Sequence, residues 1–228
     1  MTKIIGNPEK NNALLKKIVN KTIIHEKYIA NDLEFRDEVI SEIKNDMHVL
    51  DIGKSMRGKY EEILCKNKKT LDINLFEDYP DYQCDLSQDQ TIINSELQNK
   101  FDIIICLAVL EHVYNPFTAM KNIRSMLKKN GILFGYVPFL YHYHAPSNLE
   151  FQDYFRFTKD ALSYLLKDFN EVKLYPVRGR ISTSMHILMG SVWKRAFEKL
   201  GINKYLDRFS SSKKNITQCS GYNFIAKI

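Results

Sequence analysis

Short apolar runs alternate with segments of helical periodicity along most of this chain, from Met47 onward. Such alternation is typical of a parallel sheet with helices packed on both faces. The run 101–107 is almost wholly apolar, as expected for a strand that is covered on both sides. We therefore predict a doubly wound α/β fold with seven strands, at residues 48–51, 70–72, 82–84, 101–107, 131–137, 171–175 and 221–228.

Three helices are predicted in the same part of the chain. Pro116 suits the first turn of a helix, and its apolar positions and lysines continue until Gly131 ends the pattern. Thr158 can cap a second helix. A third is predicted over residues 184–200, whereas the polar run 210–217 predicts a loop before the last strand.

Length and composition favour one domain with an N-terminal extension. The 228 residues, 44% of them hydrophobic, supply enough apolar material for one sizeable core. Apolar spacing over residues 1–45 predicts a helical cap beside a domain formed by residues 46–228. The first residues lack the apolar run of a signal peptide, and no segment approaches the roughly 20 apolar residues of a membrane helix. We expect a cytoplasmic protein without a membrane span.

The formal net charge of +6 raises the question of a polyanionic partner. The lysines are scattered along the chain as single residues and pairs and never form a basic block. Charge distribution, more than net charge, identifies a nucleic-acid surface. We therefore expect no nucleic-acid partner, with an RNA substrate as the alternative. The sequence does not determine the oligomeric state.

The turn after the first predicted strand carries candidate ligand-binding residues. The strand ends at Asp51, and Gly53 and Ser55 follow. This segment resembles the first motif of the class I S-adenosylmethionine-dependent methyltransferases, in which an acidic residue precedes a glycine-rich turn. The resemblance implies that all three residues contact the cofactor, although Ser55 replaces a usual glycine. A phosphate-binding P-loop is the alternative, but Tyr60 stands where that motif needs Ser or Thr.

The next two predicted strands end in further acidic residues. Asp72 comes 21 positions after Asp51, close to the spacing of about 20 at which an acidic residue accepts hydrogen bonds from ribose hydroxyls. We expect Asp72 and Ile73 beside the cofactor, and the alternative for Asp72 is a helix cap. Asp85 and Leu86 resemble the Asp-Leu pair that contacts adenine in these methyltransferases.

The fourth predicted strand leads into the sequence Leu110-Glu-His-Val113. This segment resembles the small-molecule, type 11-like methyltransferase subfamily, and with it the fold is expected to be a Rossmann-like methyltransferase sheet with an antiparallel last strand. The resemblance implies that Leu107 and Glu111 lie beside the cofactor. His112 is a candidate base, and its alternative is a turn held by hydrogen bonds. We predict no metal, because the sequence places no second and third ligand around Glu111.

Histidine and aromatic residues follow the fifth predicted strand. They resemble a segment of bacterial methyltransferases of surface-glycan and related small-molecule pathways, which implies an acceptor site. Imidazoles can take a proton, and tyrosines can exclude water or stack on a ring. The alternatives are that the aromatic residues belong to the core and that Arg156 pairs with Asp153. The predicted acceptor residues are Tyr141, His142, Asp153, Tyr154 and Arg156.

The resemblance as a whole predicts S-adenosylmethionine as cofactor and a small-molecule or glycan-type acceptor. Methyl transfer from a sulfonium is an in-line displacement, so the protein mainly positions the acceptor and excludes water. His144 or His112 would take the proton of a hydroxyl acceptor, whereas an amine acceptor needs only a neutral nitrogen. A non-catalytic cofactor-binding module with a degenerate glycine turn, or an RNA methyltransferase, is the alternative.

Overall fold

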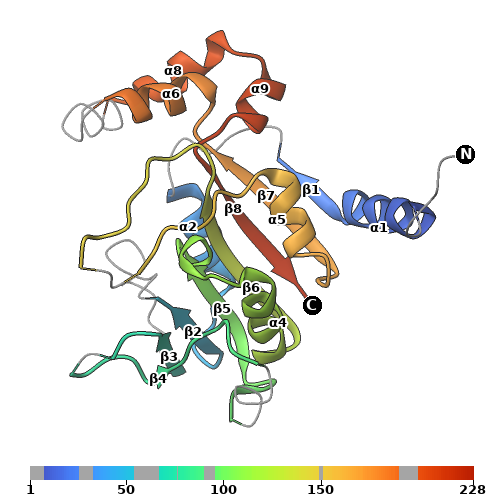
Figure 1. The fold of residues 1–228 in the computed structure, drawn as a ribbon, viewed down its shortest axis with the longest axis vertical. Helices are drawn as coiled ribbons and strands as arrows, with labels where there is room; N and C mark the ends of the chain where they lie inside the picture. Colours follow the sequence, from blue (N-terminus) through green and yellow to red (C-terminus); the bar gives the residue numbers. More distant parts are fainter. Residues whose placement is uncertain are drawn as a thin grey trace, which may run out of the picture.

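The computed structural model describes residues 8–25, 33–53, 67–75, 77–89, 96–148, 151–189 and 200–228. Its centre is an eight-stranded sheet with the order β1-β7-β8-β6-β5-β2-β3-β4 (Figure 1). The strands are β1 Thr22–Ile24, β2 His48–Ile52, β3 Asn67–Asp72, β4 Tyr82–Gln83, β5 Phe101–Leu107, β6 Leu127–Pro138, β7 Glu171–Val177 and β8 Gly221–Lys227.

The helices form two layers and one separate group. Figure 1 shows α4 and α5 in front of the sheet, α2 behind it, and α6, α8 and α9 gathered beyond one end of β7. Their bounds are α1 Pro8–Lys21, α2 Leu33–Glu42, α4 Pro116–Met126, α5 Lys159–Leu165, α6 Arg180–Leu188, α8 Ile202–Leu206 and α9 Ser212–Thr217, with the 3-10 turns η1 Leu110–His112 and η2 Asp207–Phe209.

The direction of the strands confirms the predicted fold class. All neighbouring pairs are parallel except those of β8, which runs antiparallel to both β6 and β7. The predicted number of seven strands was one too few, because β1 adds an eighth to the edge of the sheet beside β7. A strand of three residues directly after a helix has too short a pattern to be recognised from periodicity.

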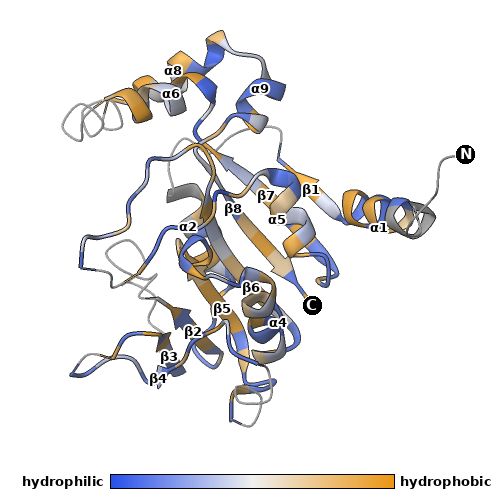
Figure 2. Ribbon diagram, in the orientation of Figure 1, coloured by the Kyte–Doolittle hydropathy of each residue, from blue (hydrophilic) through white to orange (hydrophobic). Residues whose placement is uncertain are grey.

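Apolar side chains cover both faces of the sheet. On one face, α4 and α5 pack through residues such as Ile123 and Leu162 against β5, β6 and β8. On the other, Phe35 and Val39 of α2 pack against β2, β5 and Phe134. Figure 2 shows the central strand β5 in hydrophobic colours and blue positions on β3, which lies next to the edge strand β4. This burial on both faces explains the apolar run that predicted β5.

The starts of α4 and α5 agree with the predicted helix starts, whereas the end of α4 differs from its predicted end. The Asn115 side chain accepts a hydrogen bond from the Thr118 amide at the start of α4, and Thr158 caps α5 as predicted. The prediction that the first helix continues to Gly131 was wrong, since α4 ends at Met126. Residues 127–130 belong to β6 instead, and Lys128 forms a 2.7 Å ion pair with Asp102 of β5.

The group beyond β7 also differs from its predicted form. Helix α6 begins at Arg180, before the predicted start at 184, and residues 190–199 lie outside the described part. Buried Asp207 accepts hydrogen bonds from the amides of Ile181 and Ser182, which fixes the start of α6. The loop predicted at 210–217 is largely helix α9, capped by Ser211.

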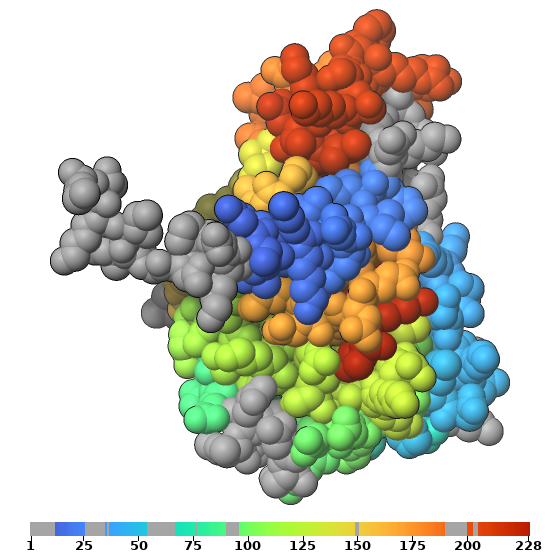
Figure 3. Space-filling view, turned by 90° about the vertical axis from the view of Figure 1, so that its right-hand side faces the viewer, coloured from blue at the N-terminus to red at the C-terminus, as the bar shows by residue number. Residues whose placement is uncertain are grey.

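The N-terminal helix lies against the domain. Figure 3 shows α1 in blue across one face of the molecule, with orange residues directly below it. The Lys21 ammonium group donates a 2.7 Å hydrogen bond to the Phe169 carbonyl just after α5, which fixes the end of α1. Among the residues that the structure describes, no helix has the length and apolar character needed to span a bilayer.

Candidate functional site

The carboxyl ends of β2, β3 and β5 meet at one edge of the sheet. Ile52 pairs with Leu71 on one side and with Cys106 on the other. The Gly53 amide extends this alignment with a 2.9 Å hydrogen bond to the Leu71 carbonyl. In open α/β sheets, ligands bind at this edge. Strand register therefore places three predicted cofactor residues there, namely Asp51, Asp72 and Leu107.

Gly53 occupies a position that only glycine fits without strain. Its φ of +70° lies in the left-handed region, and a Cβ atom would lie 2.6 Å from Cγ2 of Val109. The first turn is thus held against the segment after β5. Ser55, the third predicted residue of this turn, lies outside the described residues.

The charges of Asp51 and Glu111 both act on a buried thiol, that of Cys106. Cys106 is completely buried in β5, and burial together with the negative charges of Glu111 and Asp51 raises its pKa. Asp51 is itself 4% exposed. The structure thus brings Asp51 of β2 and the glutamate of the Leu-Glu-His-Val segment into the neighbourhood of one side chain.

Asp72 is positioned by its own loop. One carboxylate oxygen accepts a 3.0 Å hydrogen bond from the Asn74 amide, and the other accepts a 3.0 Å hydrogen bond from the Tyr79 hydroxyl. Ile73 is 53% exposed, and its carbonyl accepts a hydrogen bond from the Gln83 side chain. The bond to Asn74 caps a turn, and no helix follows it among residues 73–75 and 77–89.

The Asp85–Leu86 loop is held from α4. Asp85 accepts a 2.8 Å hydrogen bond from the Ser87 amide, and Leu86 is buried. Asn122, which is completely buried, donates hydrogen bonds of 2.8 and 3.0 Å to the carbonyls of Leu86 and Gln88. Sequence analysis missed Asn122, and the signal was an amide on the otherwise apolar face of this helix.

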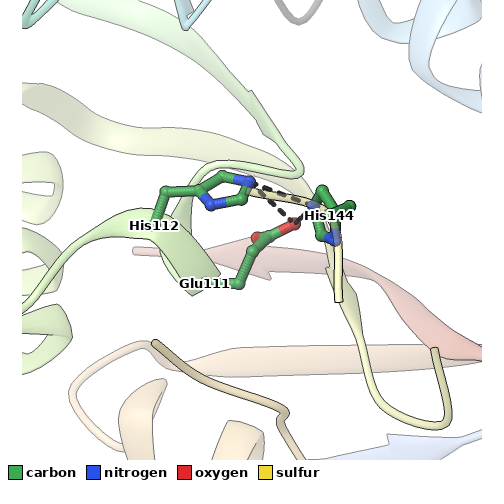
Figure 4. Close-up of side chains that lie close together, drawn as sticks. All are labelled: Glu111, His112 and His144. Carbon is green, nitrogen blue, oxygen red and sulfur yellow. Dashed lines mark hydrogen bonds and ion pairs between the residues drawn. The ribbon is translucent and has the colours of Figure 1, made fainter. Parts of the chain in front are cut away.

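Glu111, His112 and His144 converge beside the end of β5 (Figure 4). The Nε2 atoms of His112 and His144 are 3.2 Å apart. Oε1 of Glu111 lies 3.8 Å from the first and 3.9 Å from the second. The glutamate side chain is fully buried, whereas the two imidazoles are partly exposed. The two candidate bases, 32 positions apart in sequence, therefore share one place.

Two fixed acceptors orient the imidazoles. His112 Nδ1 is 2.6 Å from the carbonyl oxygen of Gln152, and His144 Nδ1 is 3.2 Å from Oδ2 of Asp153. Carbonyls and carboxylates can only accept, and the His142 carbonyl is a further acceptor 3.3 Å from His144 Nδ1. These contacts outweigh the 3.5 Å approach of the Arg156 guanidinium to the same atom and favour the proton of each ring on Nδ1. The lone pairs of both Nε2 atoms then face each other and Glu111.

Burial and charge shift the pKa values of Glu111, His112 and the neighbouring Asp153. Desolvation raises the pKa of Glu111 to about 8. Burial also lowers the pKa of His112, which favours its neutral form. The hydrogen bonds from Arg156 lower the pKa of Asp153 to about 2, so this carboxylate is ionised at neutral pH. Asp153 is thus a permanent acceptor for the His144 ring.

Arg156 holds the loops of the predicted acceptor side together. Its guanidinium group donates to both oxygens of Asp153, to the carbonyl of Phe155, and to the carbonyls of Tyr141 and His142. These contacts use all five of its N–H donors. The structure favours the alternative in which Arg156 pairs with Asp153 and positions the site.

Aromatic rings form one wall beside this group. Tyr141 stacks on His142 at 4.2 Å between ring centroids, and His186 of α6 lies 5.4 Å from Tyr141. Tyr154 is 52% exposed, and its amide donates a hydrogen bond to the Glu111 carbonyl. Sequence analysis did not select His186, because nothing in the helical pattern of α6 places it near the loop after β6.

Comparison with solved structures gives the class that this architecture defines. The fold is similar to a S-adenosylmethionine-dependent methyltransferase from Archaeoglobus fulgidus, with TM-score 0.53, 17% identity, and coverage of 86% of this chain and 92% of that one. It is equally similar to the cyclase SpnF, with TM-score 0.53, 16% identity, and coverage of 95% and 91%. At such identities the likeness shows the fold alone, that of the Rossmann-like methyltransferases.

The family follows from the sequence itself. A family model described as "Methyltransferase domain" matches residues 26–202, which is more than half of the chain. The chain belongs to this methyltransferase family. Membership confirms the expected S-adenosylmethionine-dependent methyltransferase and its cofactor, while the type 11-like subfamily stays a prediction.

Curated relatives match over a short segment. A ubiquinone biosynthesis O-methyltransferase from Histophilus somni is 45% identical over 47 residues, which are 21% of this chain and 18% of that protein. The corresponding protein of Actinobacillus pleuropneumoniae serotype 5b is 40% identical over 50 residues, or 22% and 20%. The chain thus matches about a fifth of the length of these relatives.

Proposed function

We propose that this chain methylates a hydroxyl oxygen of a small-molecule or glycan-type acceptor. The observation that carries the proposal is the pair of oriented imidazoles, His112 and His144, at the carboxyl edge of the sheet. A hydroxyl must lose its proton during methyl transfer, whereas a neutral amine need not, so paired bases favour oxygen. The short match to O-methyltransferases named for ubiquinone biosynthesis supports the same choice.

The cofactor side has residues that fit an adenosyl group. Gly53 gives the turn its left-handed backbone and its close approach to Val109, Asp72 presents a carboxylate for ribose hydroxyls, and the Asp85–Leu86 loop is fixed for adenine. We assign Asp51, Gly53, Ser55, Asp72 and Ile73 to the methionine and ribose portions, and Leu107 and Glu111 to the inner wall. S-adenosylmethionine supplies an electrophilic methyl group on a sulfonium.

The chain's own residues would prepare the acceptor. The Nε2 lone pair of His144 or His112 takes the hydroxyl proton, and Asp153 stabilises the resulting charge on His144. Buried Glu111 excludes bulk water from one side of the group. We assign Tyr141, His142 and Tyr154 to the wall that holds the acceptor, with Arg156 and Asp153 fixing that wall.

Labelled methyl transfer tests this function. Purified protein with radiolabelled S-adenosylmethionine is expected to label a small-molecule fraction of a cell extract, and mass spectrometry would identify an O-methyl product. His144→Ala should lower kcat by about 100-fold or more while leaving cofactor affinity nearly unchanged. Tyr143→Ala is the matched control, because this neighbouring side chain is 68% exposed.

Two results would contradict the proposal. A chain that binds S-adenosylmethionine but labels no fraction would be a binding module. Label that appears only in RNA, with affinity falling steeply as salt rises, would identify the RNA methyltransferase alternative.

A further inference from the structure

We propose that Glu111, His112 and His144 form a binding site for a divalent cation of the zinc class. Each residue offers one ligand atom, and the three atoms lie within 4.8 Å of one another (Figure 4). The existence of the site depends on this geometry alone. The role given below to the bound ion rests on the proposed function.

The two imidazoles are arranged as ligands. Their Nδ1 atoms face the Gln152 carbonyl and the Asp153 carboxylate, so the ring protons are assigned to that side. The two Nε2 atoms are then both acceptors, 3.2 Å apart. Two lone pairs at this distance repel each other unless one ring carries a proton on Nε2 or a metal cation lies between them. A cation shared by both rings removes the repulsion.

The carboxylate supplies a second, independent observation. Glu111 is completely buried, and neither of its side-chain oxygens has a hydrogen-bond partner among the residues that the structure describes. A buried carboxylate without a partner is costly. Its Oε1 is directed at both Nε2 atoms, from 3.8 and 3.9 Å. A metal ion among the three atoms would compensate the carboxylate and the imidazoles together.

The distances suit a tetrahedral ion. Zinc bonds to His nitrogen and Glu oxygen of about 2.0–2.2 Å place tetrahedral ligand atoms roughly 3.3–3.6 Å apart. The three observed separations are 3.2, 3.8 and 3.9 Å. Side-chain shifts of about 0.6 Å or less would close the geometry. Two His and one Glu form a set of three protein ligands that leaves the fourth position open, as in catalytic zinc sites.

The partners of the other ring nitrogens, the Nδ1 atoms, are also those expected around a metal site. Metal-binding histidines usually donate their other ring proton to a carboxylate or a backbone carbonyl, which fixes the ring. The carbonyls of Gln152 and His142 are the partners of Nδ1 of His112 and His144, and the Asp153 carboxylate lies 3.2 Å from His144 Nδ1. Arg156 in turn holds Asp153 in place. Asp153 and Arg156 are therefore positioning residues for the site.

The open position would take the acceptor oxygen. A bound cation lowers the pKa of a hydroxyl that it contacts, so the proton leaves to solvent and an alkoxide is available at neutral pH. The new O–CH₃ bond then forms while the S–CH₃ bond breaks, with its electron pair passing to sulfur. In this loaded state the two imidazoles serve as ligands in place of bases, and the acceptor class is an alcohol or phenol.

Zinc titration of the metal-free protein tests the site. Protein freed of metal with a chelator is expected to bind one Zn²⁺ per chain in calorimetry, and Co²⁺ should give the visible absorption of a tetrahedral complex. Glu111→Gln and His144→Ala should each lower affinity at least tenfold, and Asp153→Asn by about 10- to 100-fold. His48→Ala is the control, since this half-exposed histidine lies outside the group. Thermal denaturation confirms that each variant is folded.

The outcomes separate the site from the proposed function. Absence of stoichiometric zinc binding in the wild type, or unchanged affinity in folded Glu111→Gln and His144→Ala, would overturn the site. Zinc binding that depends on these residues supports the site even if no acceptor is methylated, in which case only the proposed function fails. Equal methylation rates with and without zinc would refute the role given to the ion.

Discussion

Gly53→Ala tests how the cofactor turn is held against the segment after β5. The φ of +70° disfavours any residue with a Cβ atom, and the added methyl group would lie 2.6 Å from Cγ2 of Val109. Ordinary carbon contacts are about 3.5–4.0 Å, so the overlap is roughly 1 Å. The variant therefore has two separate costs, one in the backbone and one in packing.

Each cost can be given a magnitude. Left-handed backbone costs an alanine about 1–2 kcal/mol. Overpacking by one carbon typically costs about 1–3 kcal/mol more. We expect Gly53→Ala to lower the free energy of unfolding by about 2–5 kcal/mol. Gly201→Ala is the matched control, because Gly201 has a φ of +64° and no atom within 4 Å of an added Cβ. It should show only the backbone cost.

Urea denaturation measures both variants, provided that the m-value stays constant. Gly53→Ala should be more destabilising than Gly201→Ala by about 1–3 kcal/mol. In a double variant, Val109→Ala should remove the steric overlap, so that Gly53→Ala costs about as little as Gly201→Ala when it is added to Val109→Ala. Equal losses for the two glycine variants, or no coupling between Gly53→Ala and Val109→Ala, would refute the reasoning. Affinity for S-adenosylmethionine should fall with Gly53→Ala and not with Gly201→Ala.

Three further predictions concern single side chains. Asp72→Ala should weaken S-adenosylmethionine binding by about 1.5–3 kcal/mol, and equal affinity in calorimetry would reject its assignment to ribose. Asn122→Leu should cost about 1–3 kcal/mol of stability in urea, because two carbonyls lose their donor; a loss within 0.5 kcal/mol of zero would contradict this. For Glu111, the folded-state pKa of about 8 lies above its ordinary value of 4.5, so between these pH values the folded chain binds more protons than the unfolded one. Stability of the metal-free protein should therefore fall as pH rises through this window, and Glu111→Gln should flatten the slope. An identical slope in both proteins would contradict the burial of an uncompensated carboxylate.

Much of the sheet could be predicted because its strands are buried on both faces. The apolar runs of β5 and β8 matched their strands to within one residue at either end. The start of β6 could not be predicted in this way, because Lys128 and Lys129 there follow helical spacing, and the pairing of Lys128 with Asp102 depends on the neighbouring strand. The cap at Asp207 likewise depends on a contact with residues 179–182 that no local pattern contains.

In the candidate site, too, features set by local sequence could be predicted, and features set by contacts between distant segments could not. Asp51, Gly53 and Asp72 could be chosen from sequence because strand ends are local features and sheet topology brings them to one edge. The meeting of His144 with Glu111 and His112 could not, since it depends on the path of the segment after β6. For the same reason the prediction of no metal did not anticipate that three ligand atoms converge.

The path of that segment shows how the two halves of the site are joined. Arg156 fixes the loop of Tyr141 to His144, while the amides of Tyr154 and Phe155 donate to the Glu111 carbonyl. The acceptor side is thus bonded to the end of β5 through backbone atoms, whereas in the described part of the cofactor turn Gly53 lies against the Val109 side chain. Glu111 is where the two meet, with its carbonyl accepting hydrogen bonds from Tyr154 and Phe155 and its carboxylate facing the imidazoles of His112 and His144.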